Sequence, residues 1–169
     1  MKISLNRKAV LKAGKLYEQS DYAGPREKWL MTNLLKARQR GHMTKAELQR
    51  VAQWKWRGGA VVRLVELNTP AEVREITAAS FVARSEKLRI GALLSLTGVR
   101  WPMASVILHF AFPRRYPILD QRAMKAVGGS TIYTFDRWQQ YSDLCRRCAK
   151  QLGVSLRALD RALWVHGGD

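Results

Sequence analysis

The sequence predicts an all-α protein. Apolar residues recur at helical spacing along the chain, capping residues precede most of these stretches, and no segment sustains the apolar–polar alternation that marks a strand. Only residues 61–67 could form a strand, and their neighbours favour a short helix. We therefore expect about eight to ten short helices, without repeats, low-complexity tracts or linkers.

The first half of the chain contains five expected helices. Pro25 and Pro70 each suit the first position of a helix. Thr44 and Thr69 each precede a glutamate by three residues, which is the spacing of a capping box. Asn68 suits the end of the helix before it. The expected helices cover residues 4–19, 25–40, 44–56, 60–67 and 70–83.

The second half contains five more, three of which begin after a serine or threonine cap, at Ser85, Thr134 and Ser155. The long helix after Thr134 carries one apolar stripe, which indicates that it is half-buried. The expected helices cover residues 86–95, 102–112, a short segment after Asp120, 135–152 and 155–166.

The charge balance points to a polyanionic partner. The 169 residues include 30 Lys and Arg against 13 Asp and Glu, a formal net charge of +17. Nucleic acid is the leading candidate and an anionic membrane surface the second. The basic residues are spread along the chain, which favours a folded body with a charged face over a basic tail.

Several classes of protein are not indicated. The first residues lack the apolar stretch of a signal peptide, and no run approaches the length of a membrane span. We expect a soluble protein in the cytoplasm, or associated with the nucleoid, with no membrane partner. The sequence contains no Walker A loop, dinucleotide-binding glycine motif or His-Glu-x-x-His metal site, and no metal centre is indicated.

The most informative stretch is residues 96–128. It opens with the turn Leu96-Thr97-Gly98-Val99 between two expected helices. Such a turn can leave backbone N–H groups unpaired beside the N-terminus of the second helix, which makes a small site for one phosphate. Pro102 suits the first position of that helix. The residues expected to contact DNA are Thr97, Gly98, Val99, Arg100, Trp101 and Met103.

Arg100 would lie beside the phosphate, or it would strain the turn if that position needs a positive φ. Trp101 would rest on a sugar or pack inward. The second helix is apolar nearly all round except for Ser105 and His109, which lie on one stripe. Both side chains either face a groove or are hydrogen-bonded groups of the core.

Asp120 stands before a short amphipathic segment and has two interpretations. It is an ordinary helix N-cap that accepts a backbone N–H, or a carboxylate held at the mouth of a groove by the helix dipole. Position alone does not separate the two.

These residues resemble the helix-hairpin-helix superfamily of DNA glycosylases. Leu96-Thr97-Gly98-Val99-Arg100 falls where that family has its Leu-Pro-Gly-Val-Gly hairpin. Ala104-Ser105 and Ile118-Leu119-Asp120 follow in the family's order and spacing. The resemblance implies two helical subdomains flanking a groove within one compact unit of 169 residues. We expect a helical barrel over 25–130, with the hairpin at 96–102, and residues 1–24 packing with 131–169.

The resemblance also implies a function. Asp120 would be the catalytic carboxylate of a DNA repair enzyme, a base-excision glycosylase that hydrolyses the N-glycosidic bond of a damaged, mismatched or modified base flipped from double-stranded DNA. Family members that also cut the strand carry a lysine four residues after the hairpin glycine, where this chain has Pro102. Proline cannot form a Schiff base, so we expect a monofunctional enzyme without β-lyase activity. The alternatives are a non-catalytic DNA-binding module of a repair or defence complex and a basic RNA-binding protein.

The remaining candidates are less specific. Trp54-Lys55-Trp56-Arg57 interleaves aromatic and basic residues, which suits stacking and phosphate contact, and only one of its tryptophans can face the core. Trp29 and Trp138 lie on apolar stripes and are expected in the core. The residues that could line a base pocket are Trp56, Lys55, Tyr116, Arg122 and His109.

The family's iron-sulfur cluster needs four cysteines, and this chain has only Cys145 and Cys148. We expect them to be core residues, so that no cofactor is indicated. The resemblance leaves room only for a monovalent cation at the hairpin.

Overall fold

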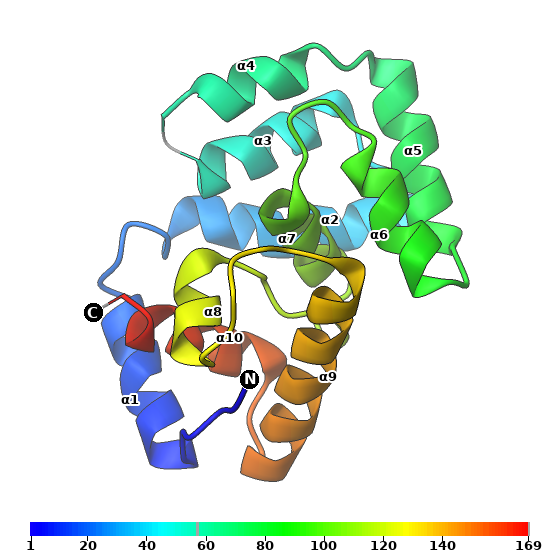
Figure 1. Ribbon diagram of the computed structural model, residues 1–169. Coiled ribbons are helices and arrows are strands. Elements are labelled where there is room, and N and C mark those ends of the chain that lie inside the picture. Colours follow the sequence, from blue (N-terminus) through cyan, green and yellow to red (C-terminus); the bar gives the residue numbers. More distant parts are fainter. Residues whose placement is uncertain (57, 169) are drawn as a thin grey trace. The chain divides into compact units, whose positions relative to one another are not determined.

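A computed structural model describes residues 1–56 and 58–168 and shows ten helices and no strand in that part of the chain (Figure 1). This confirms the all-α class. The helices are α1 (Arg7–Tyr17), α2 (Pro25–Arg40), α3 (Lys45–Lys55), α4 (Ala60–Glu66), α5 (Pro70–Val82), α6 (Glu86–Leu94), α7 (Trp101–Ala111), α8 (Gln121–Ala126), α9 (Phe135–Leu152) and α10 (Leu156–His166).

The capping residues act as the sequence predicts. Both capping boxes form, at Thr44 before α3 and at Thr69 before α5. Two helix starts differ from expectation. The chain enters α1 only after Asn6, whose side chain accepts the Ala9 N–H, and α7 begins at Trp101, which makes Pro102 its second residue.

The helices divide between two compact units. Unit 1 comprises residues 1–24 and 113–169, and unit 2 comprises residues 25–112. The predicted helical barrel over 25–130 differs from this division in residues 113–130. They belong to unit 1 because the backbone of Ile118 is bonded to its helices: its N–H donates to Asp160 on α10, and its carbonyl accepts from Tyr141 on α9.

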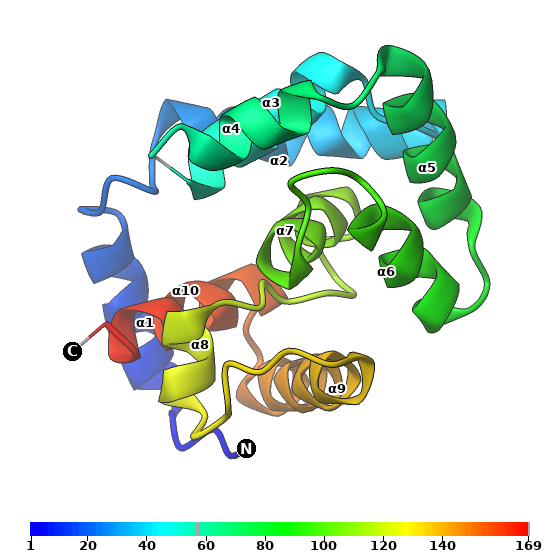
Figure 2. The same cartoon turned by 45° about the horizontal axis from the view of Figure 1, so that its top comes forward.

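Unit 2 contains the six helices α2 to α7. Its core is built on α7, where every residue from Met103 to Ala111 is buried and which packs against α2, α3 and α6 (Figure 2). The ring of Trp54 on α3 meets Phe110 of α7 edge to face at 5.4 Å. This accounts for the nearly continuous apolar sequence of α7.

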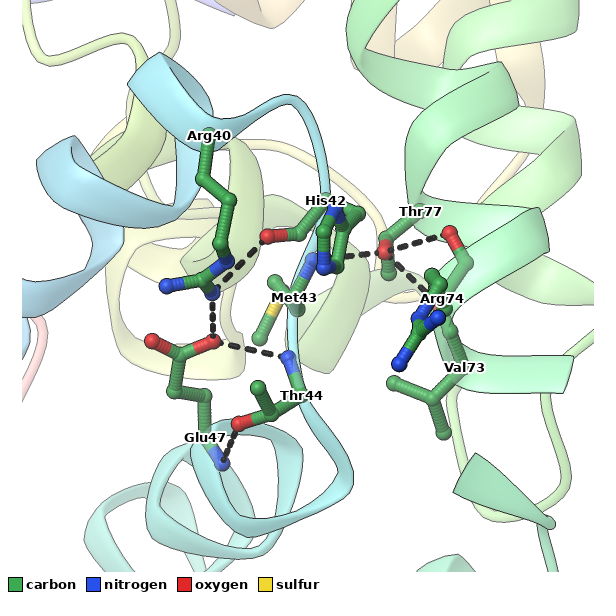
Figure 3. Close-up of polar contacts among 8 residues, drawn as sticks. All are labelled: Arg40, His42, Met43, Thr44, Glu47, Val73, Arg74 and Thr77. Carbon is green, nitrogen blue, oxygen red and sulfur yellow. Dashed lines mark hydrogen bonds and ion pairs between the residues drawn. The ribbon is translucent and has the colours of Figure 1, made fainter. Parts of the chain in front are cut away.

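The connection from α2 to α3 is fixed by polar contacts (Figure 3). The N–H of Met43 donates to the Thr77 hydroxyl on α5 over 2.8 Å, and that hydroxyl donates to the Val73 carbonyl. Glu47 accepts from the N–H of Thr44 and pairs with Arg40 at 2.6 Å. These bonds set where α3 begins.

Unit 1 contains α1, α8, α9 and α10. The helix α10 packs against each of the other three. Tyr17 of α1 meets the ring of Trp164 on α10 at 5.5 Å. Tyr116 stacks on Trp138 of α9 with the ring centroids 5.6 Å apart. The core of unit 1 is therefore aromatic and includes Trp138, as predicted.

Candidate functional site

The hairpin turn lies between α6 and α7 in unit 2. Its apolar ends, Leu96 and Val99, are buried, whereas Thr97 at the tip is exposed. The Val99 N–H closes the turn on the Leu96 carbonyl at 3.0 Å. Gly98 has a φ of +79°, a region that favours glycine.

Glycine is also needed at position 98 because the turn lies close to α4. A Cβ there would lie 2.9 Å from the Cβ of Leu64 and 3.0 Å from the backbone nitrogen of Val65. Both atoms are close to the backbone of α4, so neither can swing away. Glycine is therefore favoured at position 98 for two reasons, the positive φ and the close approach of the turn to α4.

Asn68 fixes the hairpin, and sequence reasoning missed this role. Its side-chain oxygen accepts the Thr97 N–H at 2.9 Å, and its Nδ2 donates to the Thr97 and Val65 carbonyls, each at 2.9 Å. From the sequence, Asn68 is predicted only to end α4. An asparagine after a helix signals a cap, and nothing local points to a partner 29 residues away.

Some backbone N–H groups of the hairpin are bonded within the protein and others are not. The N–H of Thr97 is used by Asn68 and that of Val99 by the turn itself. Within the described part of the chain, the N–H groups of Gly98, Arg100 and Met103 have no acceptor. Any anion at the hairpin would therefore meet these three groups at the N-terminus of α7.

The predicted DNA-contacting residues differ in exposure. Thr97 and Arg100 are exposed and Trp101 is half-buried. The side chains of Val99 and Met103 are buried, so only their backbone could reach a ligand. Arg100 has a φ of −117°, which is ordinary extended backbone, so the expected strain at this position is absent.

Asp120 lies in unit 1 at the N-cap of α8. One carboxylate oxygen accepts the Ala123 N–H at 2.8 Å, and the residue is 9% exposed. The capping interpretation is therefore confirmed. Because an N-cap fixes only one oxygen, the geometry leaves the catalytic interpretation as a prediction.

The extended segment before Asp120 is held by a buried polar network. Asp160 accepts the Ile118 N–H at 2.8 Å and pairs with Arg157. Arg157 in turn donates to the Tyr17 hydroxyl at 2.9 Å. Only Leu119 separates Ile118 from Asp120, so this network holds the backbone next to Asp120. Sequence reasoning did not find it, because its members lie on helices at opposite ends of the chain.

Tyr133 is a second residue of this region that the sequence analysis missed. Burial raises the pKa of its hydroxyl, and the negative charge of Asp120 raises that pKa further. The phenol therefore stays protonated near neutral pH and remains a hydrogen-bond donor in the vicinity of Asp120.

The candidates for a base pocket are divided between the two units. Tyr116 and His109 are fully buried in the cores of unit 1 and unit 2 respectively. The side chain of Arg122 lies over the Trp164 ring at 4.2 Å. All three residues make packing contacts, and their pocket-lining role stays a prediction.

Trp54 on α3 and Trp56 directly after that helix behave as predicted, with one ring in the core and one outside. Trp54 is 6% exposed and Trp56 is 43% exposed. Lys55 is half-buried, and Arg57 lies outside the described residues. Ser105 is buried and donates to the Pro102 carbonyl at 2.8 Å, so it is a satisfied core group.

Cys145 and Cys148 are both buried free thiols on α9, which agrees with the core role predicted for them. Burial raises the pKa of each thiol. Among the described residues, no group of three or more His, Cys, Asp or Glu side chains could hold a metal ion. No helix in residues 1–56 and 58–168 is long and apolar enough to cross a membrane.

Comparison with protein-family models, with curated proteins and with solved structures found no match to this chain.

Proposed function

We propose that the chain is a monofunctional DNA N-glycosylase that removes a damaged, mismatched or modified base. The supporting observation is the hairpin between α6 and α7, whose tip is exposed at Thr97 and whose turn is fixed by Asn68. In a chain of net charge +17, such a turn suits sequence-independent contact with the DNA backbone.

The chemistry is assigned to Asp120. As the bond between the sugar and the base breaks, the sugar gains positive charge, which a fixed carboxylate stabilises. The same carboxylate orients a water molecule, whose oxygen bonds to the sugar carbon while its proton ends on the departing base. The products are a free base and an abasic site. Pro102 supplies no amine, so no Schiff base forms.

The test is a base-release assay on duplexes that carry different damaged, mismatched and modified bases. Strand breaks that need alkali indicate a monofunctional enzyme. Asp120→Asn keeps the N-cap, because asparagine caps as well as aspartate. We expect it to retain DNA binding and to lose base release by about 100-fold or more. Undiminished release by this variant would remove Asp120 from the mechanism.

A non-catalytic DNA-binding module is the second candidate. The capping bond from the Ala123 N–H explains why an aspartate is present at position 120 without any catalytic role. This candidate predicts strongly salt-dependent DNA binding and no base release from any duplex of the panel. The same assay therefore separates the two candidates.

A further inference from the structure

A small recess lies between α2 and α3 in unit 2, and the proposed hydrolysis does not use it. Four side chains line about 240 Å³ of open space: Arg26, Trp29, Arg50 and Gln53. The first two lie three residues apart on α2 and the last two three residues apart on α3, so each pair occupies one helix face. Trp29 is half-buried here, whereas its apolar stripe predicted a core position.

The recess is positively charged and partly preorganised. The guanidinium carbon of Arg50 lies 5.3 Å from the centroid of the Trp29 ring, a cation–π contact that restrains the arginine. Arg26 lies in the first turn of α2, where the helix dipole is positive. In the described part of the chain, neither arginine is recorded in an ion pair with a carboxylate.

Size and chemistry limit what the recess can take. Much of this space is open to solvent and only a small part is enclosed, so the recess suits one small group. Two guanidinium groups and an amide offer several N–H donors in fixed planes, which match the oxygens of a phosphate. The ligand group that fits the recess is therefore a single phosphate.

We propose that the recess binds one backbone phosphate of duplex DNA, as a second contact separate from the hairpin. This inference rests on the DNA binding in the proposed function. Arg50 and Arg26 neutralise the phosphate, Trp29 keeps Arg50 oriented, and Gln53 donates from its amide. A phosphate on a headgroup in an anionic vesicle has the same chemistry, and the experiment separates the two sources.

The experiment measures binding of an undamaged duplex at several salt concentrations. The variant is Arg26→Ala with Arg50→Ala, and the control is Arg74→Ala with Arg84→Ala, which removes two exposed arginines elsewhere in unit 2. One phosphate contact contributes about 0.9 to the slope of log affinity against log salt. We expect the first variant to lose about that much slope and the control to keep the full slope. Equal slopes in the two variants would show that the recess does not bind a backbone phosphate.

Trp29 supplies a test in which no charge changes. We expect Trp29→Leu to weaken DNA binding severalfold and Trp29→Phe to restore most of it, because only an aromatic face restrains Arg50. Equal binding by Trp29→Leu and the unaltered protein overturns this role. Vesicles of anionic phospholipid form the second arm of the experiment. A loss of vesicle binding without a loss of DNA binding overturns the assignment to DNA.

The outcome is distinguishable from failure of the proposed hydrolysis. If the arginine variant loses salt slope but no duplex of the panel releases a base, phosphate binding by the recess is supported and the glycosylase activity is rejected. If base release depends on Asp120 and the two arginine variants show the same salt dependence of DNA binding, the glycosylase activity is supported and phosphate binding by the recess is rejected.

Discussion

Asn68 and Thr97 exchange two hydrogen bonds of 2.9 Å, one in each direction, across 29 residues of sequence. A third bond from Asn68 reaches the Val65 carbonyl on α4. Asn68 is buried, so its amide loses water on folding and needs these partners. Asn68, just after the end of α4, therefore holds the hairpin turn in place.

Asn68→Ala should lower the free energy of unfolding by about 2–3 kcal/mol, because the N–H and the carbonyl of Thr97 lose the partners that Asn68 provides. It should also weaken DNA binding, because the turn loses its support. Urea unfolding and duplex binding measure the two effects. Asn6→Ala is the control: it removes the N-cap of α1, which costs about 1 kcal/mol, and it should leave DNA binding unchanged. A variant of Asn68 that binds DNA normally would show that the turn does not depend on this residue.

Gly98→Ala and Gly128→Ala form a matched pair. Both glycines have positive φ, +79° and +65°, so each alanine adds about 1–2 kcal/mol of backbone strain. Only at Gly98 would the new Cβ meet other atoms, at 2.9 Å, whereas Gly128 has none within 4 Å. Overpacking adds about 1–3 kcal/mol, so we expect Gly98→Ala to be the less stable variant in urea unfolding. Equal losses would contradict the close approach of the hairpin to α4.

The sequence predicts the helices well because their signals are local. Thr44, Thr69, Thr134 and Ser155 cap the helices that their spacing indicates. A cap and an apolar stripe each involve residues within a few positions of one another. The start of α7 differs by one residue because Pro102 suits either of the first two positions of a helix.

The candidate site is less predictable, because its supports are distant in sequence. The two-way bonding of Asn68 with Thr97 and the bond from Ile118 to Asp160 join segments that no local pattern relates. Burial also depends on tertiary packing. Tyr116 and Arg122 are neighbours of Asp120 in sequence, yet one stacks on Trp138 and the other lies over Trp164.

Cys145 makes stability depend on pH in the alkaline range. Burial raises the pKa of its thiol in the folded protein, whereas in the unfolded chain the pKa is about 8.5. The folded state therefore retains the proton at a pH where the unfolded chain loses it. This contribution to stability is complete below about pH 8.5 and declines above it.

We therefore expect the free energy of unfolding to fall between about pH 8.5 and pH 10, and Cys145→Ala to make that fall shallower. Urea unfolding at a series of pH values measures it. Cys148→Ala is the control, because Cys148 is less deeply buried than Cys145, and it should flatten the profile less. Parallel profiles for the unaltered protein and Cys145→Ala would show that another group governs the alkaline range.

Two aspartate–arginine pairs of unit 1 have the same helical spacing and differ in burial. Asp160 pairs with Arg157 on α10, with 5% and 12% of the side chains exposed, and Asp143 pairs with Arg146 on α9, with 43% and 37% exposed. Asp160 also accepts the Ile118 N–H. Removing one partner of a buried pair leaves an uncompensated charge, whereas an exposed pair is largely screened by water.

Asp160→Ala should therefore cost about 3–5 kcal/mol of unfolding free energy, and Asp143→Ala less than about 1 kcal/mol. Since Ile118 leads directly to Asp120, Asp160→Ala should also slow base release in protein that remains folded, with Asp143→Ala unaffected. Urea unfolding and single-turnover base release measure the two effects. Asp160→Asn keeps an acceptor for the Ile118 N–H and should retain more base release than Asp160→Ala. If the two Asp160 variants release base equally, the bond to Ile118 does not position Asp120, and the network serves stability alone.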